Sequence, residues 1–127
     1  MPFVRISLME GKPAAYRQAI GSAIHQAMVD TINIPKKDRF QVITEHKPDG
    51  LIYDPSYFDI QRTDDIIFVQ ITMRFGRTVE QKKALYARIC ELLAESPGVR
   101  SQDVFINLVE VAIENWSFGN GIAQYAS

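Results

Sequence analysis

The sequence has one cysteine, no block of charge of one sign and no long apolar run. Because Cys90 is the only cysteine, no disulfide can form within the chain, and we expect a reducing, cytoplasmic environment. The 14 basic and 15 acidic side chains leave a formal net charge of −1, which argues against nucleic acid or an anionic membrane surface as the main partner. No apolar stretch reaches the roughly 18 residues of a membrane-spanning helix, and no export signal is visible. The remaining composition, 46% hydrophobic and 23% charged, is typical of a globular protein, and we expect one domain over residues 1–127.

Hydrophobic periodicity predicts two segments with the same layout. The expected elements are strands over 2–8, 38–46, 65–73 and 104–111 and helices over 14–32 and 78–95. Thr78, with Gln81 three residues later, resembles a capping box at the start of the second helix. The turn-rich segment 47–64 is expected to pack along the surface, with a short hairpin as one form it could take.

This order predicts an α+β fold made of two β-α-β units, over about 2–46 and 65–111. Together the units would form a four-stranded mixed sheet with both helices on one face. The uncovered face would carry Phe3, Phe68 and Phe105 among polar side chains. Because such an apolar face is rarely left in water, we expect the chain to associate with copies of itself.

Pro2 directly follows the initiator methionine, which is removed when a small residue comes next. The mature chain would then begin with a secondary amine. A free α-amino group titrates near about 8, and burial or neighbouring cations lower its pKa, so Pro2 in an arginine-lined pocket could transfer protons near neutral pH. The alternative is that Pro2 is an ordinary proline.

Arg74 and Arg77 lie three residues apart in the predicted turn after the third strand. A guanidinium offers paired donors that suit a carboxylate, so this pair could bind a small acid. Alternatively, both are solvated loop cations.

No residues in the sequence suggest a bound metal or nucleotide. His25 and His46 lack metal-ligand spacing and are interpreted as structural or surface residues, and Cys90 as a buried filler. Gly119 and Gly121 are not set between a strand and a helix as in a phosphate-binding loop. We therefore expect no cofactor.

Several stretches resemble the tautomerase superfamily, and within it the malonate semialdehyde decarboxylase group. They are Pro2 and the segments 34–41, 77–82 and 116–121, the last reading Trp-Ser-Phe-Gly-Asn-Gly. The resemblance implies an enzyme without cofactor that uses an N-terminal proline on small oxo acids and assembles mostly as a trimer or hexamer; for a chain of this length it implies a homotrimer.

The resemblance also assigns roles to individual residues. Asp38 would orient water or substrate near the proline, although by itself it could be a solvated turn carboxylate. Trp116 and Phe118 would be apolar walls of the pocket, although large aromatics also serve in packing and interfaces. The decarboxylases have Arg-Pro-Arg where this chain has Arg74-Phe75-Gly76-Arg77; Arg77 matches the second arginine, and Phe75 occupies the place of the first.

The wider spacing of the arginines is similar to that of the cis-3-chloroacrylic acid dehalogenases. Those enzymes also need a histidine, a tyrosine and a glutamate at positions that correspond here to Met28, Asn107 and about Ser117. Dehalogenation is therefore not expected.

The sequence thus predicts a proline-based enzyme whose leading activity is keto–enol tautomerisation of phenylpyruvate-type acids, with Pro2 as acid/base. One alternative is a decarboxylase or hydratase that uses the same residues. Another is a catalytically silent oligomeric binding protein of the same fold.

Overall fold

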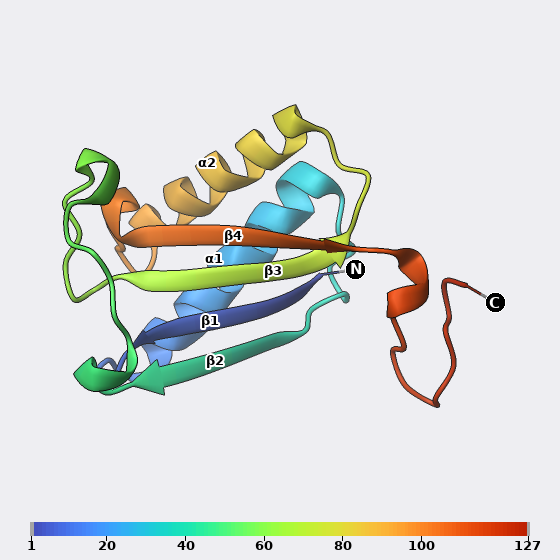
Figure 1. Ribbon diagram of the computed structural model, residues 1–127, viewed down its shortest axis with the longest axis horizontal. Helices are drawn as coiled ribbons and strands as arrows, with labels where there is room; N and C mark the ends of the chain where they lie inside the picture. Colours follow the sequence, from blue (N-terminus) through green and yellow to red (C-terminus); the bar gives the residue numbers. More distant parts are fainter. Residues whose placement is uncertain (1, 127) are drawn as a thin grey trace.

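The computed structural model describes residues 2–126 and contains one four-stranded sheet (Figure 1). Its strand order is β2-β1-β3-β4, with β1 parallel to β2, β3 parallel to β4, and β1 antiparallel to β3. The main elements are β1 (Phe3–Met9), α1 (Ala14–Ile32), β2 (Gln41–His46), β3 (Ile67–Arg74), α2 (Val79–Glu95) and β4 (Val104–Val111). The predicted mixed sheet is confirmed.

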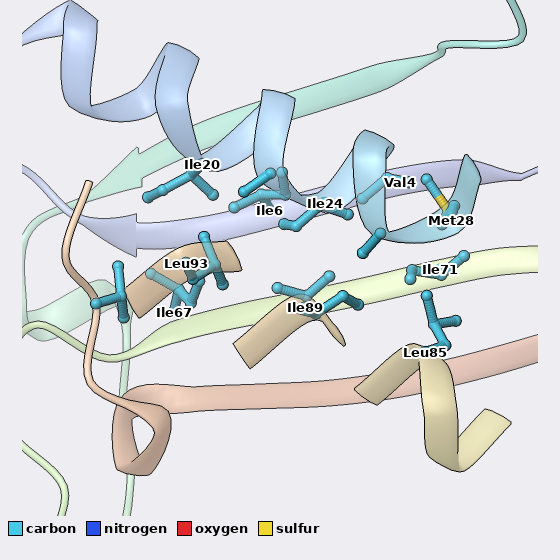
Figure 2. Close-up of a cluster of buried hydrophobic side chains, with 14 of the residues drawn as sticks. Val4, Ile6, Ile20, Ile24, Met28, Ile67, Ile71, Leu85, Ile89 and Leu93 are labelled. Carbon is cyan, nitrogen blue, oxygen red and sulfur yellow. The ribbon is translucent and has the colours of Figure 1, made fainter. Parts of the chain in front are cut away.

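Both helices cover the same face of the sheet, and the core lies between them and the two central strands (Figure 2). Alternate residues of β1 and β3 point toward the helices, as period-two alternation requires. Burying these aliphatic side chains is the main source of stability. The cluster includes Val4, Ile6, Ile67 and Ile71 from the sheet, Ile20, Ile24 and Met28 from α1, and Leu85, Ile89 and Leu93 from α2.

The ends of the helices follow local signals in the sequence. α1 ends where Asn33 adopts a left-handed backbone conformation, with φ of 58°. α2 begins at the predicted capping box: the backbone N–H of Gln81 donates to Thr78 Oγ1 at 3.1 Å, and the backbone N–H of Thr78 donates to Gln81 Oε1 at 2.9 Å. Each bond satisfies a backbone donor that the helix start would leave free.

The limits of β1 and β3 differ from the predicted ones by one or two residues, and two predictions differ more. β2 begins at Gln41 and not at residue 38, because the backbone N–H of Asp38 bonds to the carbonyl of Pro35 at 3.0 Å and forms a turn. Segment 47–64 forms no hairpin within the described residues; it contains two short 3₁₀ turns. Arg62 Nη1 donates to the carbonyl oxygens of Asp54, Tyr57 and Ile60 within this segment, and so takes carbonyls that a hairpin ladder would use.

The two β-α-β units have equivalent registers, because Val4 pairs with Gln41 and Ile67 with Val104 at the same separation along the chain. Pro2 in the first unit is therefore matched by Asp65 in the second.

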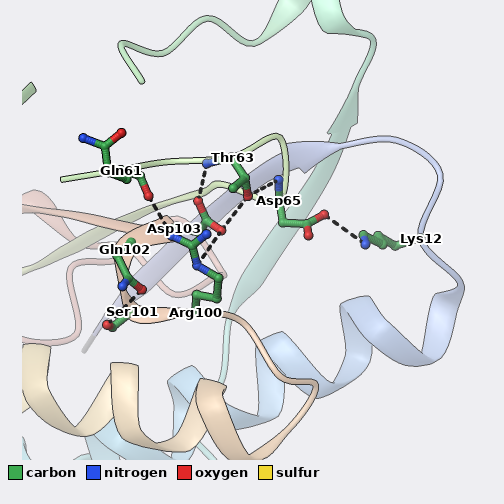
Figure 3. A network of polar contacts seen from close by, with 8 residues as sticks. All are labelled: Lys12, Gln61, Thr63, Asp65, Arg100, Ser101, Gln102 and Asp103. Atoms are coloured by element: carbon green, nitrogen blue, oxygen red, sulfur yellow. Dashed lines mark hydrogen bonds and ion pairs between the residues drawn. The ribbon is translucent and has the colours of Figure 1, made fainter. Parts of the chain in front are cut away.

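Polar contacts surround Asp65 at the start of the second unit (Figure 3). Asp65 forms an ion pair with Lys12 at 3.0 Å. Beside it, the fully buried Asp103 accepts hydrogen bonds from the backbone N–H and the hydroxyl of Thr63, both at 2.7 Å. Arg100 Nε lies 3.9 Å from the same carboxylate.

The sheet face opposite the helices carries the side chains that the strand pattern predicts. Phe68 and Phe105 meet edge to face, with ring centroids 5.2 Å apart, and Phe105 is 49% exposed. Arg5 lies over the Phe3 ring at 5.0 Å. Neither helix is long and apolar enough to cross a lipid bilayer within residues 2–126.

Candidate active site

Pro2 is buried and stands directly before β1. The backbone N–H of Val4 donates to the carbonyl of Phe40 at 3.1 Å, which ties the start of β1 to the turn that carries Asp38. On the opposite side of β1, Phe3 pairs with Thr72 of β3 in antiparallel register. The last residues of β3 and the loop that follows therefore lie at the end of the sheet where β1 starts. The topology thus brings Pro2, Asp38 and the two arginines to one end of the sheet, the end at which β1 starts and β4 finishes (Figure 1).

Asp38 is a buried carboxyl, with 5% of its surface exposed. Neither of its oxygens has a hydrogen-bond partner within the described residues. Desolvation by burial raises the pKa of Asp38, against the opposing positive charges of His25 and Arg77. The alternative of a solvated turn carboxylate is therefore wrong. A desolvated, unpartnered carboxyl is costly in a core but suited to holding a water molecule or a proton.

Arg77 is half-buried, whereas Arg74 is exposed. Arg77 Nη1 donates to the backbone carbonyl of Arg74 at 3.1 Å, which fixes the guanidinium. Burial lowers the pKa of Arg77, and the like charge of Arg74 adds to this effect. Both arginines line a polar pocket of about 310 Å³ between the end of α1 and the start of α2, a volume near the lower end for small-molecule sites. Two cations facing one space suit an anionic ligand, although Pro2 and Asp38 do not line this pocket.

Trp116 and Phe118 lie on the tail that follows β4, which extends beyond the edge of the sheet (Figure 1). Their rings stack with centroids 5.5 Å apart, and Phe118 meets Tyr125 edge to face at 5.2 Å. Arg74 lies over the Tyr125 ring at 5.9 Å. The structure therefore connects these aromatics to Arg74 through Tyr125. Among the described residues, no hydrogen bond or aromatic contact joins Trp116 or Phe118 to Pro2 or Asp38.

Tyr125 and His25 are two neighbours of the site that the sequence does not single out for it. Tyr125 is distant along the chain, and only the return of the tail brings it to Arg74. His25 belongs to the buried face of α1, so the surface alternative is wrong for this histidine. Its approach to the Asp38 turn depends on how the chain reverses after Asn33, which periodicity does not describe.

The remaining titratable candidates lie apart from this edge. Burial raises the pKa of the half-buried Cys90, which keeps it a neutral thiol. Within residues 2–126, no group of three His, Cys, Asp or Glu side chains is placed to hold a metal ion.

Comparison with known proteins identifies the class of this fold and site. A family model described as "Tautomerase enzyme" matches residues 38–119, and a second model of the same description matches residues 2–59. The chain belongs to the tautomerase family of enzymes, and the predicted superfamily is confirmed.

Individual relatives are similar to this chain in sequence, in structure or in both. The probable tautomerase YusQ of Bacillus subtilis (strain 168) is 45% identical over 98% of both chains. A crystal structure of FG41 malonate semialdehyde decarboxylase inhibited by 3-bromopropiolate is 39% identical, with a TM-score of 0.91 over 97% of this chain and 93% of that one. A fused 4-OT wild type symmetric trimer, 23% identical, shares the fold with a TM-score of 0.79 over 98% of both chains. The chain is an enzyme of the isomerase type with a decarboxylase-like structural neighbour.

Proposed function

We propose that this enzyme interconverts the keto and enol forms of small 2-oxo acids of the phenylpyruvate type, with the amine of Pro2 as acid/base. Met1, which must be removed to free that amine, lies outside the described residues. In the ketonising direction, the neutral amine of Pro2 takes the proton from the enol oxygen and delivers a proton to the carbon beside the carbonyl, so that the amine ends the cycle as it began. No electrons are transferred to another molecule, so the step requires no redox partner.

The observation that supports this proposal is the unpartnered Asp38 carboxyl beside the start of β1. A buried acceptor without a partner costs stability, roughly 1–3 kcal/mol, so its presence at the end of the sheet where Pro2 lies points to a functional role. Asp38 would orient the substrate or a water molecule while Pro2 moves the proton.

The arginine pair would bind the substrate carboxylate. Arg77 is fixed by its bond to the Arg74 carbonyl and is partly desolvated, which strengthens its interaction with an anion. It would also stabilise the negative charge that develops on the enolate oxygen. Trp116 and Phe118 would exclude solvent from the active site once the tail that carries them packs against it.

Decarboxylation is the second candidate, favoured by the likeness to malonate semialdehyde decarboxylase, whose inhibitor is a small carboxylic acid. There the carbon–carboxylate bond breaks, carbon dioxide leaves, and the resulting enolate takes a proton from Pro2. The displaced first arginine makes this reaction the more demanding one, since Phe75 stands where the decarboxylases have a cation. Release of carbon dioxide from malonate semialdehyde would decide between the two.

We further propose a homotrimer. The open sheet face exposes Phe105, and the tail with Trp116 and Phe118 extends away from its own sheet (Figure 1). Both features would be covered by neighbouring copies, and the fused 4-OT structure is itself a trimer. Light scattering coupled to size-exclusion chromatography would measure the number of chains; a monomer at micromolar concentration would contradict the proposal.

The catalytic proposal is tested by the ultraviolet absorbance of phenylpyruvate enol, which falls as the ketone forms. Intact mass of the purified protein should show that Met1 is absent. Pro2→Ala should lose at least a hundredfold in kcat, while Pro13→Ala, at the start of α1, should retain wild-type turnover. Unchanged turnover in Pro2→Ala with the oligomer intact would contradict the role of Pro2, whereas a retained Met1 together with no turnover in the wild-type protein would favour a silent binding protein.

A further inference from the structure

His25 is a buried histidine that none of the proposed chemical steps uses. It lies on α1 with 7% of its surface exposed. Its Nε2 is 2.8 Å from the carbonyl oxygen of Lys36, two residues before Asp38. Because a carbonyl can only accept, Nε2 must carry the proton and donate it.

The loop after α1 is attached to the rest of the molecule at few points. At its start, the N–H of Ile34 donates to the carbonyl of Met28 at 3.4 Å. At its end, the Gln41 side chain donates to the carbonyl of Gly21 at 2.8 Å. Gly21 permits that approach, because a Cβ there would lie 2.6 Å from Gln41 Oε1.

Between these points, two side chains of α1 bond to the turn: His25 Nε2 donates to the carbonyl of Lys36 at 2.8 Å, and Ser22 Oγ accepts a longer bond from Arg39 Nη2 at 3.4 Å. Within the described residues, His25 is the one that reaches the backbone of the turn. The neighbouring carbonyls of Pro35 and Lys37 are taken by the backbone N–H groups of Asp38 and Arg39, both at 3.0 Å. The Lys36 carbonyl receives no backbone N–H among the described residues, so loss of the imidazole donor would leave it without its partner.

Asp38 cannot hold itself in place, because neither of its oxygens forms a hydrogen bond within the described residues. Its side-chain position is set by the backbone of the turn, and the middle of that turn is held by His25. His25 is also close enough for its charge to act on the pKa of Asp38.

We propose that His25 is a positioning residue, which fixes the Asp38 carboxyl beside Pro2 through its hydrogen bond to the Lys36 carbonyl. This inference rests on the proposed function, since it assigns Asp38 a part in the reaction. His25 itself touches no substrate; it acts through the turn.

The test compares two replacements of His25. His25→Leu fills a similar space without a donor, whereas His25→Gln can present an amide N–H near the position of Nε2. His25→Leu should lower kcat for phenylpyruvate ketonisation by between tenfold and a hundredfold, because small misplacements of a catalytic group have effects of this size. Its KM should change less than threefold, since the arginines are on another loop. His25→Gln should recover most of kcat, and His46→Leu, a matched control at the far end of β2, should leave it unchanged.

A double-mutant cycle separates positioning from general damage. In an Asp38→Asn background, His25→Leu should lower kcat no further, because the group it positions is already absent. A further tenfold loss in that background would overturn the proposal, and so would wild-type kcat in His25→Leu alone.

A measurement without substrate distinguishes this inference from the proposed function. Carbon-13 NMR can follow the titration of the Asp38 carboxyl. Both replacements remove the imidazole, so the pKa of Asp38 should differ from wild type in each of them, and it should also differ between His25→Leu and His25→Gln, because only His25→Leu releases the turn. Identical titrations in all three proteins would overturn the role of His25. Full turnover in Pro2→Ala would instead overturn the proposed chemistry, whatever the NMR result.

Discussion

Replacing Asp38 by asparagine should make the protein more stable and nearly inactive. The carboxyl is buried, and neither oxygen has a hydrogen-bond partner within the described residues. Leaving a buried acceptor unpaired costs roughly 1–3 kcal/mol, and more when it is charged. An amide of almost the same shape removes the charge but keeps one unpaired acceptor and adds an unpaired NH2 donor, so the net gain that we expect at neutral pH is only about 1 kcal/mol. For a chain of this length, that corresponds to a rise in Tm of roughly 2–5 °C.

The pH dependence of this gain follows from the pKa of Asp38, which burial raises above its ordinary value of 3.8. Above the folded-state pKa, the buried carboxylate lowers stability in full. As the pH falls through that value toward 3.8, the carboxyl takes up a proton in the folded state and the penalty disappears. The stability difference between Asp38→Asn and wild type should therefore be largest at neutral pH and shrink on acidification.

The assay is thermal unfolding followed by circular dichroism at a fixed protein concentration, alongside ketonisation of phenylpyruvate enol. Turnover should fall at least a hundredfold. Asp65→Asn is the matched control, because Asp65 holds the position equivalent to Pro2 in the second unit and pairs with Lys12 on the surface. That variant should lose no more than about 1 kcal/mol and keep its activity. A less stable Asp38→Asn protein at neutral pH, or a difference that grows at low pH, would refute the reasoning.

Three further outcomes follow from the packing and the site. Ile89→Ala, at a fully buried position of α2, should lower the free energy of unfolding by about 3 kcal/mol in urea titrations, with the same m-value. Asp103→Ala removes the acceptor of two hydrogen bonds from Thr63 and should cost about 2–4 kcal/mol in the same assay, whereas Thr63→Ser should cost less than half of that. Arg77→Lys keeps a positive charge but loses the planar fork, so KM for phenylpyruvate should rise about tenfold in steady-state kinetics; an unchanged KM would show that Arg77 does not bind the carboxylate.

Local signals in the sequence predict most of the fold. The stripe of α1 and the Thr78 capping box give helix limits that agree with the structure. The alternation in β1 and β3 assigns Phe3 and Phe68 to the open face, where they are found. The start of β2 is not predictable in this way, because the turn at Asp38 depends on backbone hydrogen bonds that leave no periodic trace.

The candidate site is less accessible to sequence reasoning than the fold. Pro2, Asp38 and Arg77 follow from the resemblance to relatives, and the topology explains why they share one edge. The absence of hydrogen bonds to Asp38 within the described residues, and the tie from His25 to the Lys36 carbonyl, are properties of three-dimensional packing. No spacing along the chain encodes them.

The matching registers of the two β-α-β units have a consequence for stoichiometry. A nitrogen inside a polypeptide is an amide and has no basic lone pair, so duplicating the scaffold does not duplicate the terminal base. No residue at position 65 can therefore take over the proposed role of Pro2. The ion pair between Asp65 and Lys12 has a structural role only. A chain of this design supplies one reactive terminus for every two structural units.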